Sequence, residues 1–374
     1  MERQGKIAFY APLKSPDDPT PSGDREIARL MMKALRFAGY DVELMSQVIS
    51  YQKRPTQELY EMRKATVSAE EARIRNLWNS DRSVIPDLWF TYHPYCKSPD
   101  WLGPSLCKAF GVPYVTAEAC RTRQGVDGDW KEGRAAAQAA IRFAKVNFVL
   151  KESDWRYLSS LMPAMETAVR IKPFIDMADL PPVSRPASLF ENDAPTVFSA
   201  GMMRPGAKME SYKVLAAALN QISDKKWNLV VAGEGPERTR VEDLLHHAGA
   251  ARVKFTGSVE HEQMFALMDS SDIFAWPGIG EAIGLVYLEA QARGVPVVAL
   301  QTAGVPLVVK DSVGGLLTEE DRPDVYAAAI GRLLDSPELR EQLGTAGRHH
   351  VAEHHDLRTT AAIFRSHIDK IIAT

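Results

Sequence analysis

The sequence predicts an α/β protein built from two doubly wound domains. Short apolar runs of strand length alternate with helical patterns along most of the 374 residues, an order that is typical of parallel sheets covered by helices. A Pro-rich stretch over residues 179–195 interrupts this alternation, and after it the order of strand, helix and strand begins again. The length also suits two domains. We therefore expect domains over residues 1–180 and 181–356, followed by a terminal helix at about 357–374.

Composition and charge exclude several other classes of protein. Hydrophobic residues make up 45% of the chain and charged residues 25%, which excludes a wholly disordered or collagen-like chain. The formal net charge of −3 argues against a nucleic-acid partner, because proteins that bind nucleic acids are usually strongly basic. No apolar stretch reaches the roughly 18 residues of a membrane span, and MERQGKIAFYAPL lacks the apolar core of a signal peptide. The three cysteines, an odd number without C-x-x-C spacing, favour a reduced, cytoplasmic protein without disulfides.

The first domain begins with a strand–loop–helix–strand unit. KIAFYAP (6–12) has the pattern of a strand, REIARLMMKALRFAGY (25–40) that of a helix, and DVELMS (41–46) that of the next strand. Further strands are expected at DLWFTYH (87–93), PYVTAEA (113–119) and VNFVLKES (146–153). Residues 47–85 interrupt this order and predict a solvated helical insertion. The alternative for this segment is a contact with an acceptor or a membrane surface, since Tyr, Trp and Arg suit an interface.

The second domain repeats the pattern. Helices are expected at MESYKVLAAALNQI (209–222) and EQMFALMDSS (262–271). The expected strands are PTVFSAG (195–201), WNLVVAG (227–233), VKFTG (253–257), IFAWPG (273–278), PVVAL (296–300) and GGLLT (314–318). In doubly wound sheets ligands bind beyond the carboxyl ends of the strands. We therefore expect the site residues in the loops that follow the strands, at a cleft between the two domains.

The loop and helix within PGIGEAIGLVYLEAQARGVPVVA (277–299) are the most informative part of the chain. The loop presents Glu281, and a helix that starts near Gly284 contains Glu289. Backbone N–H groups at a helix N-terminus form an anion site, and carboxylates can accept hydrogen bonds from sugar or ribose hydroxyls. The alternative is that Glu289 is a partly exposed helix residue and that Glu281 is an acid favoured by the helix dipole.

This string resembles the E-x7-E signature of retaining glycosyltransferases of family 4, which have the GT-B fold of two Rossmann-like domains. The family's usual form is close to E-G-F-G-L-x-x-x-E-A-x-A-x-G-x-P-V-V, and this chain has E-A-I-G-L-V-Y-L-E-A-Q-A-R-G-V-P-V-V. Similar strings extend over most of the second domain, whereas the resemblance of the first domain is weaker. These strings are VVAGEGPERTRVEDLL (230–245), VKFTGSV (253–259), GGLL (314–317) and DSPELREQLGTAGR (335–348).

The resemblance implies an activity. It implies that a sugar is transferred, with retention of configuration, from a nucleotide-diphospho-sugar to an acceptor hydroxyl on a glycan or glycolipid, without a metal or other cofactor. It also implies that the terminal helix, LRTTAAIFRSHIDKII (357–372), crosses back onto the first domain. We expect a cytoplasmic protein whose first domain is a candidate contact for the inner face of a membrane. The alternatives are a phosphorylase or epimerase of the same fold and a non-catalytic protein that binds nucleotide-sugars.

In the second domain the resemblance gives roles to residues of four loops. Glu281 is expected to contact the donor sugar and Glu289 the ribose. Arg204 and Lys208 are expected to hold the diphosphate, because fixed cations stabilise its developing charge; the alternative is a pair of solvated loop charges. The other expected donor contacts are the backbone amides of Ile283, Gly284 and Leu285, the glycines Gly233 and Gly235, and Gly257, Ser258 and Val259. For GEGP (233–236) the alternative is a tight turn without a ligand.

In the first domain, candidates follow two of the predicted strands. Gly23 in PSGDRE (21–26) lacks a Cβ, so the backbone can approach donor phosphates or the acceptor closely. The alternative is a helix-capping turn with Asp24. His93 ends a predicted strand and is a catalytic candidate near the acceptor, with a structural histidine as the alternative. Glu118 stands where many members of the family have His, which is a departure from the family pattern.

Two patterns resemble metal sites, although we expect no metal. DGD (127–129) matches the D-x-D that holds a metal in the other main glycosyltransferase fold, yet it follows no clear strand. His350, Glu353 and His354 form H-x-x-E-H, a zinc-peptidase pattern. No glutamate follows them in the sequence to serve as a third ligand, so a polar helix is expected there.

Overall fold

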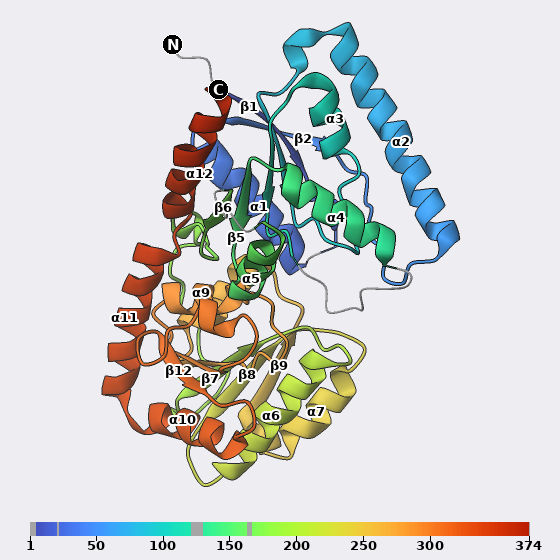
Figure 1. Ribbon diagram of the computed structural model, residues 1–374. Helices are drawn as coiled ribbons and strands as arrows, with labels where there is room; N and C mark the ends of the chain where they lie inside the picture. The colour runs from blue at the N-terminus through green and yellow to red at the C-terminus, as the bar shows by residue number, and fades with distance from the viewer. Residues whose placement is uncertain (1–4, 21, 121–129, 163–166, 374) are drawn as a thin grey trace. The chain divides into compact units, whose positions relative to one another are not determined.

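The computed structural model describes residues 5–20, 22–120, 130–162 and 167–373 (Figure 1). The chain forms two compact units. The N-terminal unit contains residues 1–172 and 357–374, and the C-terminal unit contains residues 173–356. Each unit is built around a six-stranded sheet in which the paired strands are parallel. The predicted architecture of two doubly wound α/β sheets is therefore confirmed.

The sheet of the N-terminal unit has the strand order β2-β1-β3-β4-β5-β6. Its strands are β1 (Lys6–Tyr10), β2 (Asp41–Ser46), β3 (Leu88–Tyr92), β4 (Tyr114–Ala117), β5 (Val146–Val149) and β6 (Ala168–Arg170). Every residue of β3, β4 and β5 is buried, as expected for central parallel strands with both faces covered. The chain moves outward from β1 to β2 and then crosses to β3 on the other side. This reversal is a switch point, where the loops after β1 and β3 separate and leave room for a ligand.

The helices of the N-terminal unit are α1 (Gly23–Phe37), α2 (Gln57–Ser80), α3 (Gly103–Phe110), α4 (Lys131–Phe143), α5 (Glu152–Leu161) and α12 (Leu357–Ile372), with a short 3-10 helix at Arg82–Val84. The last of them, α12, lies beside α1 (Figure 1). Its Phe364 is fully buried and packs on Phe90 and Phe148, with ring centroids 5.6 and 4.8 Å away. The end of the chain thus completes the hydrophobic core of the unit that holds its beginning.

The predicted insertion at 47–85 contains the helix α2, but one side of this helix is not solvated. Tyr60, Val67, Ile74 and Trp78 are buried along it. The Trp78 ring meets the rings of Trp89 and Phe110 edge to face, at centroid distances of 6.3 and 5.1 Å. The apolar residues recur about every seven positions, which places them on one stripe of a helix. The segment is therefore a structural part of the unit, and its other side faces solvent.

The sheet of the C-terminal unit has the order β12-β11-β10-β7-β8-β9. Its strands are β7 (Thr196–Ala200), β8 (Asn228–Ala232), β9 (Val253–Gly257), β10 (Ile273–Ala275), β11 (Val297–Leu300) and β12 (Gly315–Thr318). Its helices are α6 (Ala207–Gln221), α7 (Arg238–His246), α8 (His261–Asp269), α9 (Leu285–Ala292), α10 (Pro323–Asp335) and α11 (Pro337–His354), with 3-10 helices at Met177–Asp179, Ala250–Arg252 and Val305–Leu307. Here the switch point lies between β7 and β10, so the loops that follow these two strands are neighbours.

The Pro-rich stretch is attached to the C-terminal unit. The unit boundary follows Lys172, whereas the sequence suggested a boundary after residue 180. Residues 173–180 join the second unit because His355 Nδ1 lies 2.7 Å from the carbonyl oxygen of Pro173 and the backbone of Ile175 bridges to Asp356. Further along, Arg293 donates to the carbonyl of Pro181 at 2.7 Å. Among the helices that the structure describes, none combines the length and apolar composition needed to cross a membrane.

Candidate functional site

The loops after β7 and β10 bring two predicted residues of the C-terminal unit together. Lys208 lies in the first turn of α6, and Glu281 lies in the loop after β10. The Lys208 Nζ donates to Glu281 Oε2 at 2.5 Å, and the two side chains are 28% and 21% exposed. The Lys208 Nζ also lies 5.4 Å from the centre of the Trp276 ring, a favourable position for a cation. A cation and a carboxylate are thus held at the switch point, both partly open to solvent.

Glycines shape the loop that carries Glu281. Gly278 and Gly284 have φ values of 78° and 77°, which glycine adopts most readily. The hydroxyl of Tyr287 in α9 reaches back to the carbonyl of Trp276 at 3.0 Å, and a Cβ on Gly278 would lie only 2.2 Å from that hydroxyl oxygen. The backbone N–H of Ile279 donates to Ser211 on α6 at 3.0 Å. The loop is therefore fixed both to its own helix and to the helix of Lys208.

The N-terminus of α9 offers free backbone donors next to Glu281. Gly284 is the N-cap residue, and no side chain caps the helix. Within the described part of the chain, the amides of Ile283, Gly284 and Leu285 have no hydrogen-bond acceptor. Unpaired N–H groups at a helix start attract anions. The three amides that the sequence predicts to contact a diphosphate therefore lie beside Glu281 without an acceptor in the described residues.

Arg204 and Glu289 are the other two side chains predicted for the donor site. Arg204 is exposed in the loop after β7, and its guanidinium forms no hydrogen bond or ion pair with any residue that the structure describes. Glu289 lies on α9 with a half-exposed side chain. Of the four predicted side chains, Lys208 and Glu281 are in contact with each other.

The glycines of GEGP (233–236) are required by close backbone packing. Gly233 and Gly235 have φ values of 142° and 156°. A Cβ would lie 2.0 Å from the carbonyl oxygen of Gly201 at the first position and 2.2 Å from that of Met203 at the second. Met203 N donates to the carbonyl of Glu234 at 2.9 Å. The turn therefore braces the loop between β7 and α6, which explains both glycines without a ligand.

The third predicted donor loop follows β9. Gly257 is buried with a φ of 74°, while Ser258 is exposed and Val259 half-exposed. The Glu234 carboxylate lies over Gly257, where a Cβ would be 3.0 Å from Glu234 Oε1. Glu234 in turn pairs with Arg238 on α7. This loop is thus adjacent to the GEGP turn.

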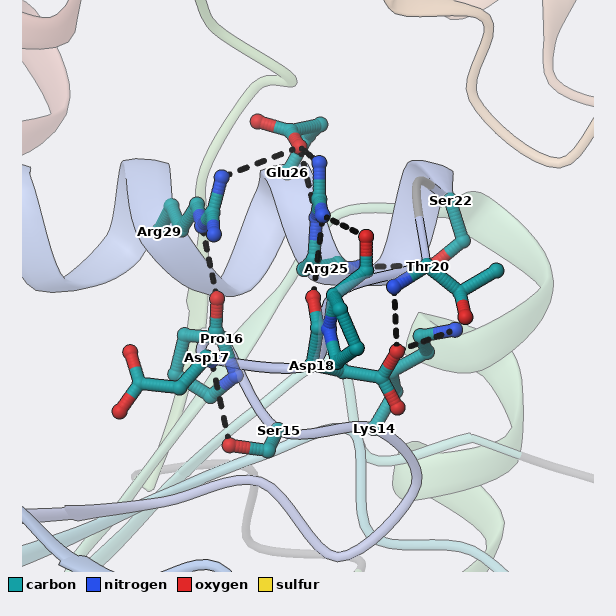
Figure 2. A network of polar contacts seen from close by, with 11 residues as sticks. Lys14, Ser15, Pro16, Asp17, Asp18, Thr20, Ser22, Arg25, Glu26 and Arg29 are labelled. Atoms are coloured by element: carbon teal, nitrogen blue, oxygen red, sulfur yellow. Dashed lines mark hydrogen bonds and ion pairs between the residues drawn. The ribbon is translucent and has the colours of Figure 1, made fainter.

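In the N-terminal unit the loop after β1 is fastened to α1 by arginines (Figure 2). The Arg25 guanidinium donates to the carbonyls of Asp18 and Pro19 at 3.0 and 3.2 Å, and Arg29 Nε donates to the carbonyl of Pro16 at 2.7 Å. Ser22, not Asp24, caps α1, because its Oγ accepts from Arg25 N at 3.3 Å. Gly23 is exposed, has no unusual φ, and a Cβ there would meet nothing within 4 Å. The described residues therefore do not themselves require a glycine at this position.

The Asp24 side chain instead reaches His93 across the switch point. Asp24 Oδ1 lies 3.3 Å from His93 Nδ1, an ion-pair distance slightly longer than an ordinary hydrogen bond. On the other side of the ring, His93 Nε2 lies 3.5 Å from Cys120 Sγ. The ring also stacks on Tyr95 at 5.0 Å. His93 is thus held between an acidic side chain and a thiol.

A buried ion pair lies behind His93. Glu118 is 2% exposed and accepts from Lys151 at 2.6 Å and from the Tyr92 hydroxyl at 2.8 Å. Burial by itself raises the pKa of Glu118, but Lys151 and then His93 outweigh it, so the pKa is lowered. Burial likewise disfavours a charged His93, yet Glu118, Cys120 and Asp24 together raise its pKa well above the usual value. The cluster therefore favours an imidazolium at His93.

The structure does not arrange the described residues of the metal-like patterns as a set of metal ligands. These residues contain no group of three His, Cys, Asp or Glu side chains arranged to hold an ion. DGD (127–129) lies outside the described residues. His350, Glu353 and His354 lie on α11, where the rings of His350 and His354 meet edge to face at 4.7 Å.

Comparison with known proteins gives two kinds of similarity. Residues 183–350 match the family model described as "Glycosyl transferases group 1". The D-inositol 3-phosphate glycosyltransferase of Streptomyces griseus is 41% identical over 99 residues, which are 26% of this chain and 21% of the relative. The matched part of such curated relatives is between 21% and 39% of their length.

Solved structures match nearly the whole chain. Sucrose-phosphate synthase from Thermosynechococcus elongatus has a TM-score of 0.73 at 20% identity, covering 99% of this chain and 100% of that one. HepE of Anabaena in complex with UDP has a TM-score of 0.70 at 16% identity, covering 98% and 100%. At these identities the likeness establishes the fold.

This chain has the GT-B fold.

Within this GT-B fold, sequence reasoning missed three residues of the N-terminal cluster. Tyr92, Lys151 and the role of Asp24 were not predicted. A signal was available, because His93, Glu118 and Lys151 each lie at or near the carboxyl end of a predicted strand. The carboxyl ends of neighbouring parallel strands meet at one edge of a sheet, so polar residues at these places should meet. The sequence did not give the order of the strands, and the cluster could not be assembled without it.

Proposed function

We propose that the chain is a retaining glycosyltransferase of family 4 that transfers a sugar from a nucleotide-diphospho-sugar to an acceptor hydroxyl. The observation that carries this proposal is the contact of Lys208 with Glu281 at 2.5 Å, beside the uncapped start of α9. A cation, a carboxylate and free amides at one switch point suit a ligand that has both phosphates and hydroxyls. The similarity of residues 183–350 to group 1 glycosyltransferases supports the same conclusion.

The proposed chemistry needs charge stabilisation on the leaving diphosphate. Lys208, Arg204 and the amides of residues 283–285 would hold the diphosphate as its negative charge grows. Glu281 would orient the sugar and Glu289 the ribose. The acceptor hydroxyl would attack on the face that the diphosphate leaves, with a phosphate oxygen taking its proton. This mechanism needs no enzyme nucleophile and no metal.

The proposed acceptor is a glycan or glycolipid bound by the N-terminal unit. His93 would lie near the acceptor at the carboxyl edge of this unit's sheet. The relative from Streptomyces is named for an inositol phosphate, which is a polyol with an anionic group. We include acceptors of this kind in the proposal. Large apolar side chains on α2, Met62 and Leu77, are 57% and 41% exposed, which supports a contact of this helix with a cytoplasmic membrane surface or a lipid acceptor.

A binding experiment with matched lysines tests the donor site. UDP-, GDP- and ADP-sugars are screened by thermal shift, since a ligand that binds the folded state raises the melting temperature. The affinity of the best donor is then measured for Lys208→Met and for Lys213→Met, whose lysine lies on the same helix and pairs with Glu210. We expect Lys208→Met to lose about 1.5–3 kcal/mol, or roughly 10- to 150-fold in affinity, and Lys213→Met to bind normally.

The same proteins are assayed for release of nucleoside diphosphate, with and without acceptors, in the presence of a chelator. Transfer that is slowed in Lys208→Met but persists in the chelator supports the proposal. A chain that binds no nucleotide-sugar, or binds one equally well in both variants, contradicts it. Turnover that requires free phosphate would indicate a phosphorylase instead.

A further inference from the structure

The three cysteines of the chain lie in different surroundings. All three are free; Cys96 and Cys107 are buried, and Cys120 is half-exposed. Burial raises the pKa of the Cys107 thiol well above its usual value, so this thiol is inert. Cys120 differs from both, because its Sγ lies 3.5 Å from His93 Nε2 and remains partly accessible.

Cys120, His93 and Asp24 form a chain of three groups. The thiol meets one nitrogen of the imidazole, and the carboxylate meets the other at 3.3 Å. A nucleophile beside a base that a third group orients is the arrangement of nucleophilic enzyme sites. The three residues come from separate places in the sequence, namely the first turn of α1, the end of β3 and the segment after β4.

The imidazole ring has a fixed position. His93 has a φ of 57°, and its backbone N–H donates to the carbonyl of Ala117 at 2.8 Å. Tyr95 stacks on one face of the ring with an interplanar angle of 25°, and Tyr92 meets it edge-on at 5.6 Å. A ring that is held in this way does not have to be ordered before it stabilises a neighbouring thiolate.

The charges around the ring are mainly negative. In the described residues Asp24 faces it from α1 and Glu118 from the end of β4, while Lys151 at the start of α5 pairs with Glu118 and approaches Asp154 at 3.7 Å. Tyr92 and Tyr95 are neutral at ordinary pH. The carboxylates of Glu118 and Asp24 raise the pKa of His93 and so favour a proton on the imidazole. An imidazolium beside the thiol stabilises the thiolate form.

We propose that Cys120 is a nucleophilic thiol that is activated by His93, with Asp24 as the positioning residue, and that it is a site of covalent modification by disulfides. In the reaction the thiol loses its proton to solvent, and Sγ, as a thiolate paired with the imidazolium of His93, attacks one sulfur of the disulfide. One Sγ–S bond forms and one S–S bond breaks, and the other sulfur leaves as a thiolate. No further oxidant is needed. The adduct lies at the carboxyl edge of the N-terminal sheet, so modification blocks acceptor use, a consequence that rests on the proposed function.

The test follows the reaction of the folded protein with an aromatic disulfide, 5,5′-dithiobis(2-nitrobenzoate), whose released thiolate absorbs visible light. We expect one fast phase, from Cys120, and slow reaction of Cys96 and Cys107. Cys120→Ser removes the fast phase. His93→Gly slows it at least tenfold, and Asp24→Asn slows it several-fold. His246→Gln, at a histidine of α7, leaves the rate unchanged.

Chemical rescue separates activation from a loss of structure. Glycine at position 93 tolerates the positive φ and leaves the space of the imidazole ring, so added imidazole should restore the rate in His93→Gly but not raise it in the wild type. A wild-type protein without a fast phase, a fast phase that survives in His93→Gly, or a variant that imidazole does not rescue would overturn the proposal.

Transfer activity is measured on the same samples after labelling. If labelling inhibits the wild type, if a reductant restores the activity, and if Cys120→Ser is not inhibited, the adduct at Cys120 blocks acceptor use. Rapid labelling without inhibition shows that it does not. A protein that labels rapidly yet never transfers sugar contradicts the proposed function and leaves the reactive thiol established.

Discussion

His93 and Glu118 have a backbone conformation that is uncommon for residues with side chains. Their φ values are 57° and 55°, and they follow the neighbouring strands β3 and β4. A non-glycine residue in this region costs on the order of 1–3 kcal/mol and persists only where the surroundings hold it. At Glu118 the surroundings are the ion pair with Lys151 and the hydrogen bond from Tyr92. The contacts that hold the strained backbone of Glu118 thus also fix the charges of the candidate site.

Removal of the Glu118 charge should destabilise the protein in a pH-dependent way. Glu118→Gln leaves Lys151, which is 19% exposed, with the more distant Asp154 carboxylate at 3.7 Å, and we expect a loss of about 2–3 kcal/mol in the free energy of unfolding at pH 7. The pKa of Glu118 is lowered from 4.5 in the folded state. Its contribution is therefore fully present above about pH 4.5 and is lost as the pH falls through the folded-state pKa.

Urea denaturation at several pH values checks this prediction. The difference between wild type and Glu118→Gln should shrink toward acid pH. Glu210→Gln removes an exposed carboxylate that is 2.8 Å from Lys213, and it should change stability by less than about 0.5 kcal/mol. A Glu118 effect that is small at pH 7, or that is constant down to pH 3, would show that the pair does not stabilise the fold.

At the scale of elements, two helices of the C-terminal unit begin at glycines with positive φ. Gly206 precedes α6 with a φ of 85°, and Gly284 precedes α9 with a φ of 77°. Neither helix has a side-chain cap. The two glycines differ in their surroundings, because a Cβ on Gly284 would lie 2.6 Å from the Tyr287 ring, whereas one on Gly206 would meet nothing within 4 Å. Only the start of α9 is closely packed.

An alanine at each glycine separates backbone strain from packing. Gly206→Ala should cost about 1–3 kcal/mol, because a φ of 85° with a ψ of −139° lies in a backbone region that is almost restricted to glycine. Gly284→Ala should cost about 3 kcal/mol or more, because a clash with a buried ring is added, and it should also weaken binding of the donor. Thermal and urea unfolding measure the two stabilities. Equal losses in the two variants would mean that the contact with Tyr287 relaxes easily.

At the scale of the whole molecule, the chain enters the N-terminal unit twice. It leaves this unit after Lys172 and returns at Leu357, so the core around β3 and β5 is completed only by the last helix. Phe364 is fully buried between Phe90 and Phe148. The stability of the N-terminal unit therefore depends on a helix that follows the whole C-terminal unit in the sequence.

Truncation of Phe364 should reveal this dependence. Phe364→Ala leaves a cavity against Phe90 and Phe148, and we expect a loss of about 3–5 kcal/mol in the free energy of unfolding. Phe37→Ala is the control, because Phe37 is 61% exposed on α1 and its truncation should cost less than about 0.5 kcal/mol. Urea unfolding followed by far-UV circular dichroism compares the two. A Phe364→Ala protein as stable as the Phe37→Ala protein would show that α12 adds little to the unit.

The sequence by itself determined the class of fold and the positions of most elements, because these depend on local patterns. Alternation of apolar runs and helical spacing located the strands of both sheets, and only β6 (Ala168–Arg170), a short strand at a sheet edge, was not predicted. The resemblance of residues 277–299 to a known signature pointed to Glu281, and the loop after β7 to Lys208, before their contact was known.

Only the tertiary structure decided which of the candidates meet. Asp24 looked like a helix cap and His93 like an isolated strand end, yet they lie 3.3 Å apart because β1 and β3 are neighbours in the sheet. Glu118 and Lys151 meet for the same reason, across β4 and β5. Strand order depends on how helices pack across a sheet and on the direction of each crossover connection, and these are properties of contacts between distant residues that no local pattern contains.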